Sequence, residues 1–400
     1  MRRILTIIGL EVLAVTLVIV AMSHGVTTDE AKYLLNIPYP HPPLLRGIVG
    51  ITRFLPGQEF FWRLMFATLL LQAVWFVISF LPDREHTERF ALGCLWILSA
   101  AVFTLAGQIL MAPATALFAL VFCRLLLQQD EDSEDMAGWI ALLWLASLFT
   151  AYQAILFVPI VFTVFWRMRL PLGKKLLCIA GPVLLLVIYS ATNPFAVASM
   201  VTAGEQNAGA GTLFDALRGT GRLWIVGGSV VLSILGTIGM VSSRRWSLVL
   251  SLLLVAAFIT VSFRPYYCIL FTPLFIAGVA AHPRLLRMPA ITLVLTIFFS
   301  AFIVPRSLPS FDRSPARVTM QTLAANRVTE GMILIAGPFG HEWQYESSLT
   351  VRRYGPRLID SSRAVICLAD CPEVRWRKNW RILPGLPVEV WMRTLAAWKK

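Results

Sequence analysis

Long apolar runs recur through the first 305 residues of this 400-residue chain, and they limit its fold more than any other feature. A hydrocarbon core about 30 Å thick requires a helix of roughly 17–25 apolar residues. The run from Ile4 to Met22 meets this requirement, and comparable runs follow it. Charged residues make up only 14% of the chain, whereas soluble domains average about 25%. The sequence therefore predicts an α-helical, polytopic membrane protein.

We predict about eleven transmembrane helices from these runs. They lie near residues 4–22, 60–81, 89–106, 109–127, 137–150, 153–166, 176–192, 223–241, 246–263, 266–281 and 288–305. The segments 137–150 and 153–166 count separately, because a single helix over both would be about 45 Å long. With this count the short inner loops of residues 1–305 carry more Arg and Lys residues than the longer outer loops do, as the positive-inside rule requires. An odd number of spans places the C-terminus outside.

The N-terminus allows two interpretations. Arg2 and Arg3 before an apolar run resemble the start of a signal peptide. The run is long, however, and the residues around Ala21 form a poor cleavage site, which favours a retained first span. The chain also lacks any Asn-x-Ser/Thr glycosylation site, as is common in bacterial envelope proteins. We expect a multi-pass protein of the bacterial cytoplasmic (inner) membrane, with its C-terminus in the periplasm.

Residues 1–305 form the predicted transmembrane domain. It includes a large first outer loop, 23–59, and a second outer loop, 193–222. The second loop contains the glycine-rich stretch 203–211 and a short amphipathic piece, 213–217. Glycine leaves the backbone conformationally free, so this loop is either a mobile lid or a plain connector. Both alternatives stay open.

Residues 306–400 form the predicted periplasmic α/β domain. The apolar stretch Gly331–Gly337 predicts a buried strand, and the flanking segments Ser314–Asn326 and Trp343–Tyr354 predict helices. The tail carries 15 Lys and Arg residues against 8 Asp and Glu residues. Beside a bilayer such a surface meets membrane lipids, and it is equally well explained as a solvated face. Nucleic acid is not an expected partner.

The six cysteines fall into two groups. Four of them lie in apolar spans, where we expect them to be unreactive packing residues: Cys94, Cys123, Cys178 and Cys268. The other two, Cys367 and Cys371, are four residues apart in the tail and predict a local disulfide in an oxidising compartment.

Functional side chains concentrate in the first outer loop. Thr27-x-x-Glu30 is a capping box, which predicts a short helix that runs to about Asn36 and accounts for Glu30 without any ligand. Capping does not account for the adjacent acid, Asp29. Several prolines stiffen the segment that carries Tyr39 and His41.

These residues resemble a known family. An Asp-Glu pair after the first span, a few helical residues with Tyr33, and a segment with His41-Pro42-Pro43 resemble the first outer loop of the GT-C glycosyltransferases. The resemblance extends to bacterial polyprenyl-phosphate-sugar transferases, the group that contains the lipid A aminoarabinose transferases and relatives of the protein mannosyltransferases. It covers nearly the whole chain, from the many spans to the outer C-terminal domain.

The resemblance implies an inverting transfer of a sugar from a polyprenyl-phosphate donor to a lipid, glycan or protein acceptor on the outer face. By it, Asp29 is the general base and Glu30 positions acceptor or donor. His41 stands where relatives have a Lys that contacts the donor phosphate. Further candidates for donor-phosphate or substrate binding are Lys32, Tyr39, Arg46, Arg264, Tyr266 and Tyr267. Cations and hydroxyl donors stabilise a leaving phosphate, and a carboxylate accepts the acceptor's proton.

Two positions depart from the family pattern. Ala114 stands where relatives often carry an acid after a proline, and Ala151-Tyr152-Gln153 stands where many carry a Lys between two short helices. The sequence shows no definite cofactor site, and it leaves open whether the protein binds a divalent metal ion. Arg264 with its two following tyrosines also fits a plain membrane-interface belt.

Two other functions remain as alternatives. A transporter or flippase for a lipid-linked substrate usually shows internal repeats and charges near the membrane midplane. The predicted spans contain almost no charge apart from Glu11, Arg63 and Arg124, and no repeat relates the two halves. A non-catalytic subunit is the third interpretation. Motifs for nucleotide binding or serine hydrolysis are absent from the sequence.

Overall fold

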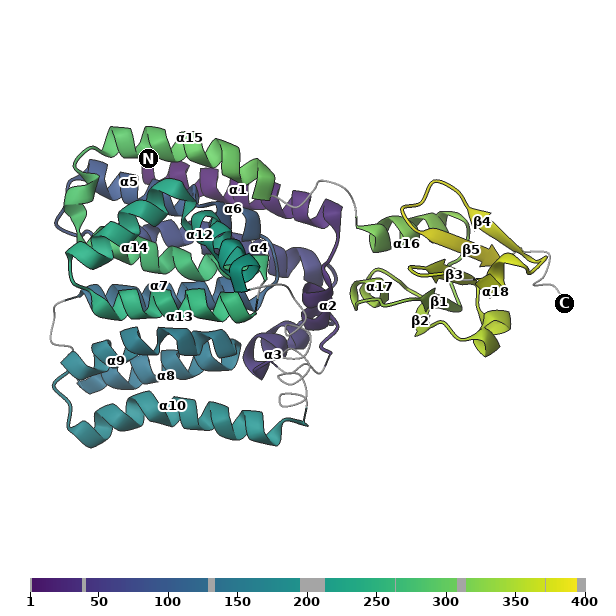
Figure 1. Ribbon diagram of the computed structural model, residues 1–400, viewed down its shortest axis with the longest axis horizontal. Coiled ribbons are helices and arrows are strands. Elements are labelled where there is room, and N and C mark those ends of the chain that lie inside the picture. The colour runs from purple at the N-terminus through teal and green to yellow at the C-terminus, as the bar shows by residue number, and fades with distance from the viewer. Residues whose placement is uncertain are drawn as a thin grey trace. The chain divides into compact units, whose positions relative to one another are not determined.

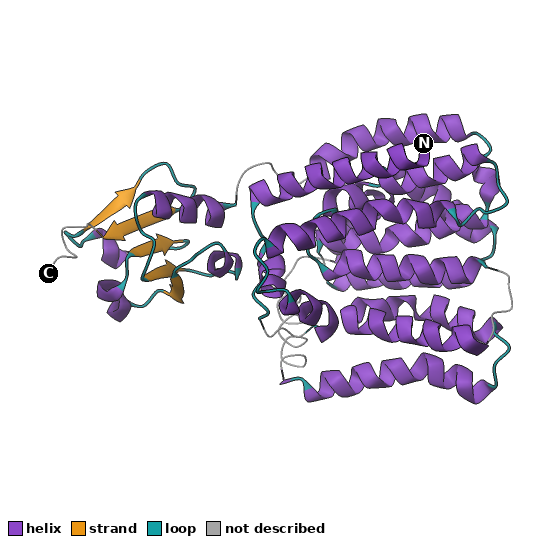
Figure 2. Ribbon diagram, turned by 180° about the vertical axis from the view of Figure 1, so that it is seen from behind, coloured by secondary structure: helices purple, strands orange, loops and turns teal. Residues whose placement is uncertain are grey.

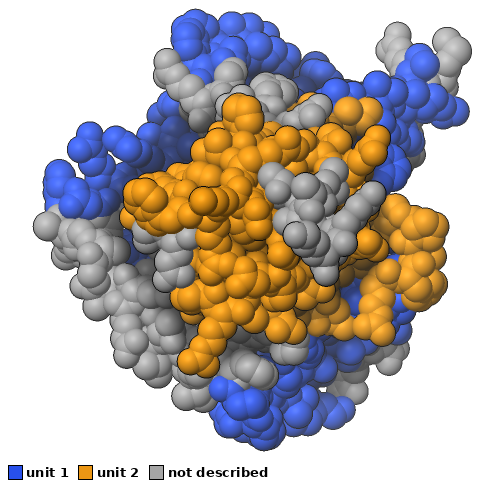
Figure 3. All heavy atoms as spheres, turned by 90° about the vertical axis from the view of Figure 1, so that its right-hand side faces the viewer, with its two compact units in different colours: residues 1–18, 38–52, 60–308 blue, residues 19–37, 53–59, 309–400 orange. Residues whose placement is uncertain are grey.

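The computed structural model describes residues 2–37, 41–128, 134–194, 213–262, 264–307, 314–370 and 372–393. These residues are mostly helical, with one small sheet near the C-terminus (Figures 1 and 2). They form two compact units, which Figure 3 shows in different colours. The helical unit contains residues 1–18, 38–52 and 60–308, and the sheet unit contains residues 19–37, 53–59 and 309–400.

Helices of the predicted transmembrane region make up the helical unit, and two of them, α1 and α4, have an end that belongs to the sheet unit. Their bounds are α1 (Arg2–His24), α3 (Pro43–Ile51), α4 (Gln58–Ile78), α5 (His86–Ile97), α6 (Ala100–Leu105), α7 (Met111–Leu127), α8 (Glu134–Thr150), η1 (Tyr152–Phe157), α9 (Val158–Arg167), α10 (Leu172–Thr192), α12 (Leu213–Ser242), α13 (Trp246–Val261), η2 (Pro265–Phe271), α14 (Thr272–Ala281), η3 (Pro283–Leu286) and α15 (Pro289–Ser307). The helices α7 to α10 and α13 run side by side in both ribbon views.

Helix occupies most of every predicted span, but the predicted span 89–106 is divided, because α5 ends at Ile97 and α6 begins at Ala100. Among the described residues, four helices are long and apolar enough to cross a membrane: Ile4–His24, Gln58–Ile78, Leu172–Thr192 and Leu217–Ser242. Shorter apolar helices account for most of the other predicted spans. The chain is therefore a multi-pass membrane protein. The predicted break between two short helices is confirmed, because α8 ends at Thr150 and Ala151 is extended, with φ −158°.

Glycines set the closest helix packing in the helical unit. A Cβ atom built on Gly239 of α12 would lie 2.0 Å from the carbonyl oxygen of Gly278 in α14. A Cβ on Gly278 would lie 2.2 Å from the carbonyl oxygen of Gly236. Small residues allow such backbone approach in membranes, where lipid removes the hydrophobic drive for helix association. α12 is also kinked at Ser229, whose φ is +57°.

The replacement Gly239→Ala should therefore destabilise the protein, because overpacking costs about 1–3 kcal/mol. The matched control is Gly138→Ala in α8, where a Cβ meets nothing within 4 Å. Alanine also favours helix over glycine by about 1 kcal/mol, so the control should be neutral or stabilised. Thermal unfolding in detergent measures both, and equal melting temperatures for the two variants would contradict the packing role of Gly239.

The sheet unit contains the C-terminal domain together with the segment that follows α1. Its elements are α2 (Thr28–Leu34), α16 (Pro315–Ala325), β1 (Met332–Ala336), α17 (Glu342–Tyr345), β2 (Thr350–Arg353), η4 (Pro356–Ser361), β3 (Ala364–Cys367), α18 (Pro372–Arg375), β4 (Trp380–Leu383) and β5 (Glu389–Arg393). The strand order is β2-β1-β3-β5-β4. β1 pairs in parallel with β2 and β3, and β5 pairs antiparallel with β3 and β4.

Two of the three elements predicted in the tail are confirmed. β1 is buried between two glycines with positive φ, Gly331 at +101° and Gly337 at +105°. α16 begins after Ser314, whose side chain accepts a hydrogen bond from the backbone N–H of Arg317. A buried apolar strand and a capped helix are both encoded locally, so the sequence pattern suffices for them.

The predicted helix Trp343–Tyr354 is wrong. Helix α17 ends at Tyr345, and the chain from Thr350 to Arg353 forms strand β2 instead. Thr350 and Val351 have β-branched side chains, which favour a strand, and they pair with Met332 and Ile333 of β1. Pairing with a neighbouring strand thus determines the structure of this polar segment.

The predictions for the second outer loop and for Cys371 concern residues that the structure does not fully describe. Residues 195–212 of the second outer loop lie outside the described part of the chain, and its amphipathic piece, 213–217, is the beginning of α12. Cys94, Cys123, Cys178 and Cys268 are free thiols. Cys367 is disulfide-bonded, and Cys371 lies outside the described residues.

Candidate active site

The predicted capping box is present at the start of α2. The backbone N–H of Thr27 donates to Glu30 Oε2 at 2.8 Å, and the backbone N–H of Glu30 donates to Thr27 Oγ1 at 3.4 Å. Glu30 is only 1% exposed. Its carboxylate is thus buried, and it accepts a hydrogen bond from the Thr27 N–H, a backbone donor that has no partner within the helix.

Asp29 has a different environment on the same helix. Its side chain is 32% exposed, and Oδ1 lies 2.9 Å from Nζ of Lys32, one helical turn later. The Lys32 side chain is 15% exposed. The ion pair limits the orientations of the Asp29 carboxylate while part of it faces outward. Of the two adjacent acids, Asp29 is therefore the more exposed.

Residues of the C-terminal domain hold the backbone just before Asp29. The Thr28 hydroxyl donates to Glu342 Oε2, and the backbone N–H of Val26 donates to Glu346 Oε1 at 3.2 Å. A Cβ on Gly340 would lie 2.2 Å from both Thr28 Oγ1 and Glu342 Oε2, so a larger residue there would displace these two side chains.

A cleft of about 650 Å³ opens beside this contact in the sheet unit. Its lining comes from the first outer loop and from the tail: His24, Val26, Thr27, Thr28, Ser314, Pro315, Ala316, Pro338, Phe339, Gly340, Glu342, Trp343, Leu368 and Val388. The wall is mostly apolar, with one carboxylate, Glu342, and several hydroxyl groups. The cleft thus adjoins Thr28, the residue before Asp29.

In the helical unit, the short helix η1 contacts the predicted phosphate residue His41. The rings of His41 and Tyr152 lie 6.1 Å apart between centroids. The Tyr152 hydroxyl accepts a hydrogen bond from Ser190 Oγ at 3.3 Å. His41 itself is half-buried, just before Pro42 and the start of α3.

The next residue of η1 contacts the other predicted phosphate segment. Gln153 Nε2 donates to the Tyr267 hydroxyl at 2.9 Å, and both side chains are buried. Gln153 Oε1 is also buried and has no hydrogen-bond partner among the described residues. Tyr266 packs on Tyr267 with ring centroids 4.7 Å apart, and Arg264 is exposed just before η2.

The predicted site residues thus divide between the two units. Asp29, Glu30 and Lys32 lie in the sheet unit, and His41, Arg264, Tyr266 and Tyr267 lie in the helical unit. Arg46 is half-buried in α3 of the helical unit, and Tyr39 lies outside the described residues. Within the helical unit, η1 contacts both His41 and Tyr267.

Sequence reasoning missed the part that η1 plays. It treated Tyr152 and Gln153 as departures from a family pattern rather than as site residues. The available signal was the helix break at Ala151, since broken helices in membranes often line binding sites. No group of three His, Cys, Asp or Glu side chains that could hold a metal ion occurs in the part of the chain that the structure describes.

Comparison with known proteins gives a fold-level match. No family model matches the sequence, and no curated protein matches it at a significant level. The solved structure of ArnT from Cupriavidus metallidurans bound to undecaprenyl phosphate is similar over 98% of both chains, with a TM-score of 0.69 and 13% identity. The apo ArnT structure also covers 98% of both chains, with a TM-score of 0.64 and 12% identity. The chain therefore has the fold of the ArnT structures, as the resemblance in the sequence implies.

Proposed function

Since the chain has the fold of the GT-C membrane glycosyltransferases, we propose that it is an inverting glycosyltransferase with a polyprenyl-phosphate sugar as donor. It transfers the sugar to an acceptor on the outer face of the bacterial cytoplasmic membrane. The ArnT structure with undecaprenyl phosphate supports a lipid donor of this kind, because the two chains share their fold over nearly their whole lengths.

The observation that carries the proposal is the pair of contacts at η1. His41 and the segment 264–267 are more than 200 residues apart in sequence, and both were assigned to the donor phosphate from the sequence alone. Tyr152 contacts the first, and Gln153 bonds to Tyr267 of the second. An imidazole, a guanidinium and phenol hydroxyls are the donors that a leaving phosphate requires. Because η1 contacts both His41 and Tyr267, we infer that these two residues belong to one phosphate site.

In the proposed reaction, an acceptor hydroxyl attacks the anomeric carbon from the side opposite the phosphate. The bond from this carbon to the phosphate oxygen breaks, and the electron pair stays on the polyprenyl phosphate. Arg264, His41 and the Tyr267 hydroxyl stabilise the charge that develops on the leaving oxygen. The Asp29 carboxylate accepts the proton of the acceptor hydroxyl.

The remaining candidates have supporting roles in this proposal. Lys32 orients Asp29 through their ion pair, and Glu30 holds the start of α2 through the capping box. Tyr266 packs against Tyr267. Arg46 and Tyr39 lie near His41 in sequence and add a cation and a hydroxyl on the donor side. Gln153 Oε1 offers a buried acceptor to a sugar hydroxyl, since buried polar atoms are normally hydrogen-bonded.

A flippase for the same lipid is the main competitor, and reconstitution in sealed vesicles separates the two. The vesicles contain undecaprenyl phosphate linked to a labelled monosaccharide, with a panel of such sugars tested in turn. Lipid A, a glycan or a peptide is supplied with them as the acceptor. An enzyme separates label from lipid and leaves transbilayer movement at the rate of empty vesicles. Accelerated movement with every donor intact would contradict the proposal.

The proposal places the active site and the C-terminal domain, 306–400, in the periplasm. The disulfide at Cys367 supports this, because disulfides persist in oxidising compartments. In spheroplasts of cells that make the protein, a membrane-impermeant maleimide should label Cys367 only after an impermeant reductant has been added. A Cys367→Ser, Cys371→Ser variant is the control for labelling elsewhere. Labelling that requires lysis would contradict an outer C-terminus.

A further inference from the structure

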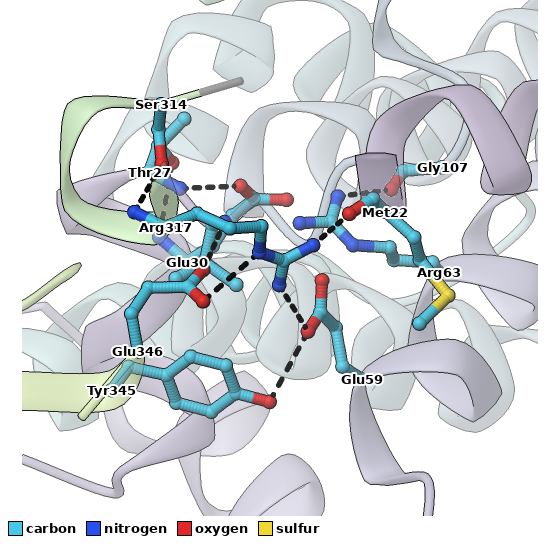
Figure 4. Close-up of polar contacts among 11 residues, drawn as sticks. Met22, Thr27, Glu30, Glu59, Arg63, Gly107, Ser314, Arg317, Tyr345 and Glu346 are labelled. Carbon is cyan, nitrogen blue, oxygen red and sulfur yellow. Dashed lines mark hydrogen bonds and ion pairs between the residues drawn. The ribbon is translucent and has the colours of Figure 1, made fainter. Parts of the chain in front are cut away.

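Arg317 joins chain segments that are far apart in sequence. Its guanidinium donates from Nε to Glu346 Oε2 at 2.9 Å and from Nη2 to Glu59 Oε2 at 3.3 Å. Nη1 donates to the backbone carbonyl oxygen of Met22 (Figure 4). Arg317 lies in α16, and Glu346 directly follows α17. Glu59 is in the first turn of α4, and Met22 is in the last turn of α1. One side chain thus connects the tail with the ends of two apolar helices.

The cluster is shielded from water. The side chains of Arg317, Glu59 and Glu346 are 15%, 9% and 8% exposed. The Tyr345 hydroxyl donates to Glu59 Oε2 at 3.4 Å, as Figure 4 shows. Ion pairs in such surroundings contribute little net stability compared with apolar packing, but they are specific in geometry. The planar guanidinium supplies donors in three fixed directions, and a lysine cannot reproduce this.

The same cluster fixes the backbone that leads to Asp29. The Glu346 carboxylate that pairs with Arg317 also accepts from the N–H of Val26, and the N–H of Ser314 donates to the His24 carbonyl oxygen at 2.8 Å. Gly25 has φ +104°, and a Cβ there would lie 2.9 to 3.2 Å from Ser314 Oγ, Glu346 Oε1 and Arg317 Nε. The segment 22–28 therefore has close contacts with α16 and α17 at several successive residues.

We propose that Arg317, with Glu59 and Glu346, is a positioning residue for the transfer reaction. It fixes the segment 22–28 and thereby sets where α2 presents the Asp29 carboxylate to the acceptor hydroxyl. The inference rests on the proposed function, and it gives the C-terminal domain a part in turnover that requires no ligand contact by that domain. A misplacement of about 1 Å in a reacting group can cost about 10²-fold in rate.

The test compares three variants in the full-length, membrane-embedded protein. Arg317→Met removes the three hydrogen-bond donors of the guanidinium. Arg317→Lys keeps the positive charge but not the planar arrangement of these donors. Arg375→Met is the matched control, because Arg375 lies in the same unit and, among the described residues, its side chain pairs with Glu389 at 2.8 Å and with Asp370 at 3.5 Å. Each variant is assayed for release of undecaprenyl phosphate from the sugar-linked donor in the presence of an acceptor that the wild type uses. Affinity for sugar-free undecaprenyl phosphate and thermal unfolding are measured as well.

We expect kcat to fall about 10²-fold for Arg317→Met and less for Arg317→Lys. The affinity for undecaprenyl phosphate should stay within about twofold in both, because the proposed phosphate contacts lie in the other unit. Arg375→Met should behave as wild type. Normal kcat in Arg317→Met, or an equal loss in Arg375→Met, would overturn the inference.

Two further measurements keep the inference testable when one variant fails. Glu59→Gln removes one charge and keeps an acceptor, so it should lower kcat even where Arg317→Met does not fold. Amide hydrogen exchange of residues 22–34 needs no activity: it should speed up in Arg317→Lys and not in Arg375→Met. Unchanged exchange would overturn the positioning role, whereas no donor cleavage by the wild type would contradict the proposed function instead.

Discussion

Asp29→Asn is expected to lower the rate of sugar transfer by about 10²–10⁴-fold while expression and donor binding stay near wild type. Asparagine keeps the size of the side chain and most of its hydrogen bonding, but it cannot accept the acceptor's proton. The Asp29 side chain is partly exposed and held by Lys32 at 2.9 Å, so the substitution leaves the buried core unchanged. Single-turnover kinetics with bound donor measure the chemical step directly.

Glu30→Gln is the matched control for this prediction. Glutamine preserves the acceptor that the Thr27 N–H uses in the capping box, and Glu30 is buried at 1% exposure. Its effect on transfer should therefore be several-fold rather than a hundredfold or more, with a small loss in thermal stability. Near-normal transfer by Asp29→Asn would remove the central residue from the mechanism. An equally severe loss in Glu30→Gln would give Glu30 a direct role in substrate positioning.

Arg264→Ala is expected to weaken binding of undecaprenyl phosphate by about 10–100-fold, since hydrogen bonds to charged groups contribute about 1.5–3 kcal/mol. Arg264 is exposed at the start of η2, so its loss should not disturb folding. His41→Ala should weaken binding less, by a few-fold, because an imidazole makes fewer bonds to phosphate than a guanidinium does.

Isothermal titration or a competition assay with labelled undecaprenyl phosphate measures both affinities. Arg287→Ala is the control, since Arg287 is another exposed arginine that follows a short helix, η3. It should bind the lipid as wild type does. Unchanged affinity in both Arg264→Ala and His41→Ala would contradict phosphate binding by these residues and would favour a role at the membrane interface instead.

Features encoded within a few residues were predicted correctly from the sequence. The Thr27–Glu30 capping box depends on two side chains three residues apart, and β1 depends on a short apolar run between glycines. The helix break at Ala151 follows from the length limit of a membrane span. Each of these has a cause that acts locally or through the bilayer, so no tertiary information was needed.

Features that depend on distant partners were not predicted. Strand β2 exists because Thr350 to Arg353 pair with β1, and the same residues were expected to be helical. Gln153 meets Tyr267 across 114 residues, and Arg317 meets Glu59 across 258 residues. A polar side chain within an apolar stretch can be recognised in the sequence. The distant side chain that it contacts is known only from the fold.

Release of free undecaprenyl phosphate from a radiolabelled, sugar-linked donor tests the central claim most directly. The purified protein in lipid nanodiscs is incubated with donors that differ in their sugar, each offered with lipid A, a glycan and a peptide in turn as the acceptor. The lipid and sugar products are separated by chromatography. The glycosyltransferase account predicts that the wild type releases free lipid phosphate with at least one donor, and that Asp29→Asn binds that donor without releasing it. Intact donor after prolonged incubation with every sugar tested, despite tight binding of undecaprenyl phosphate, would contradict the account.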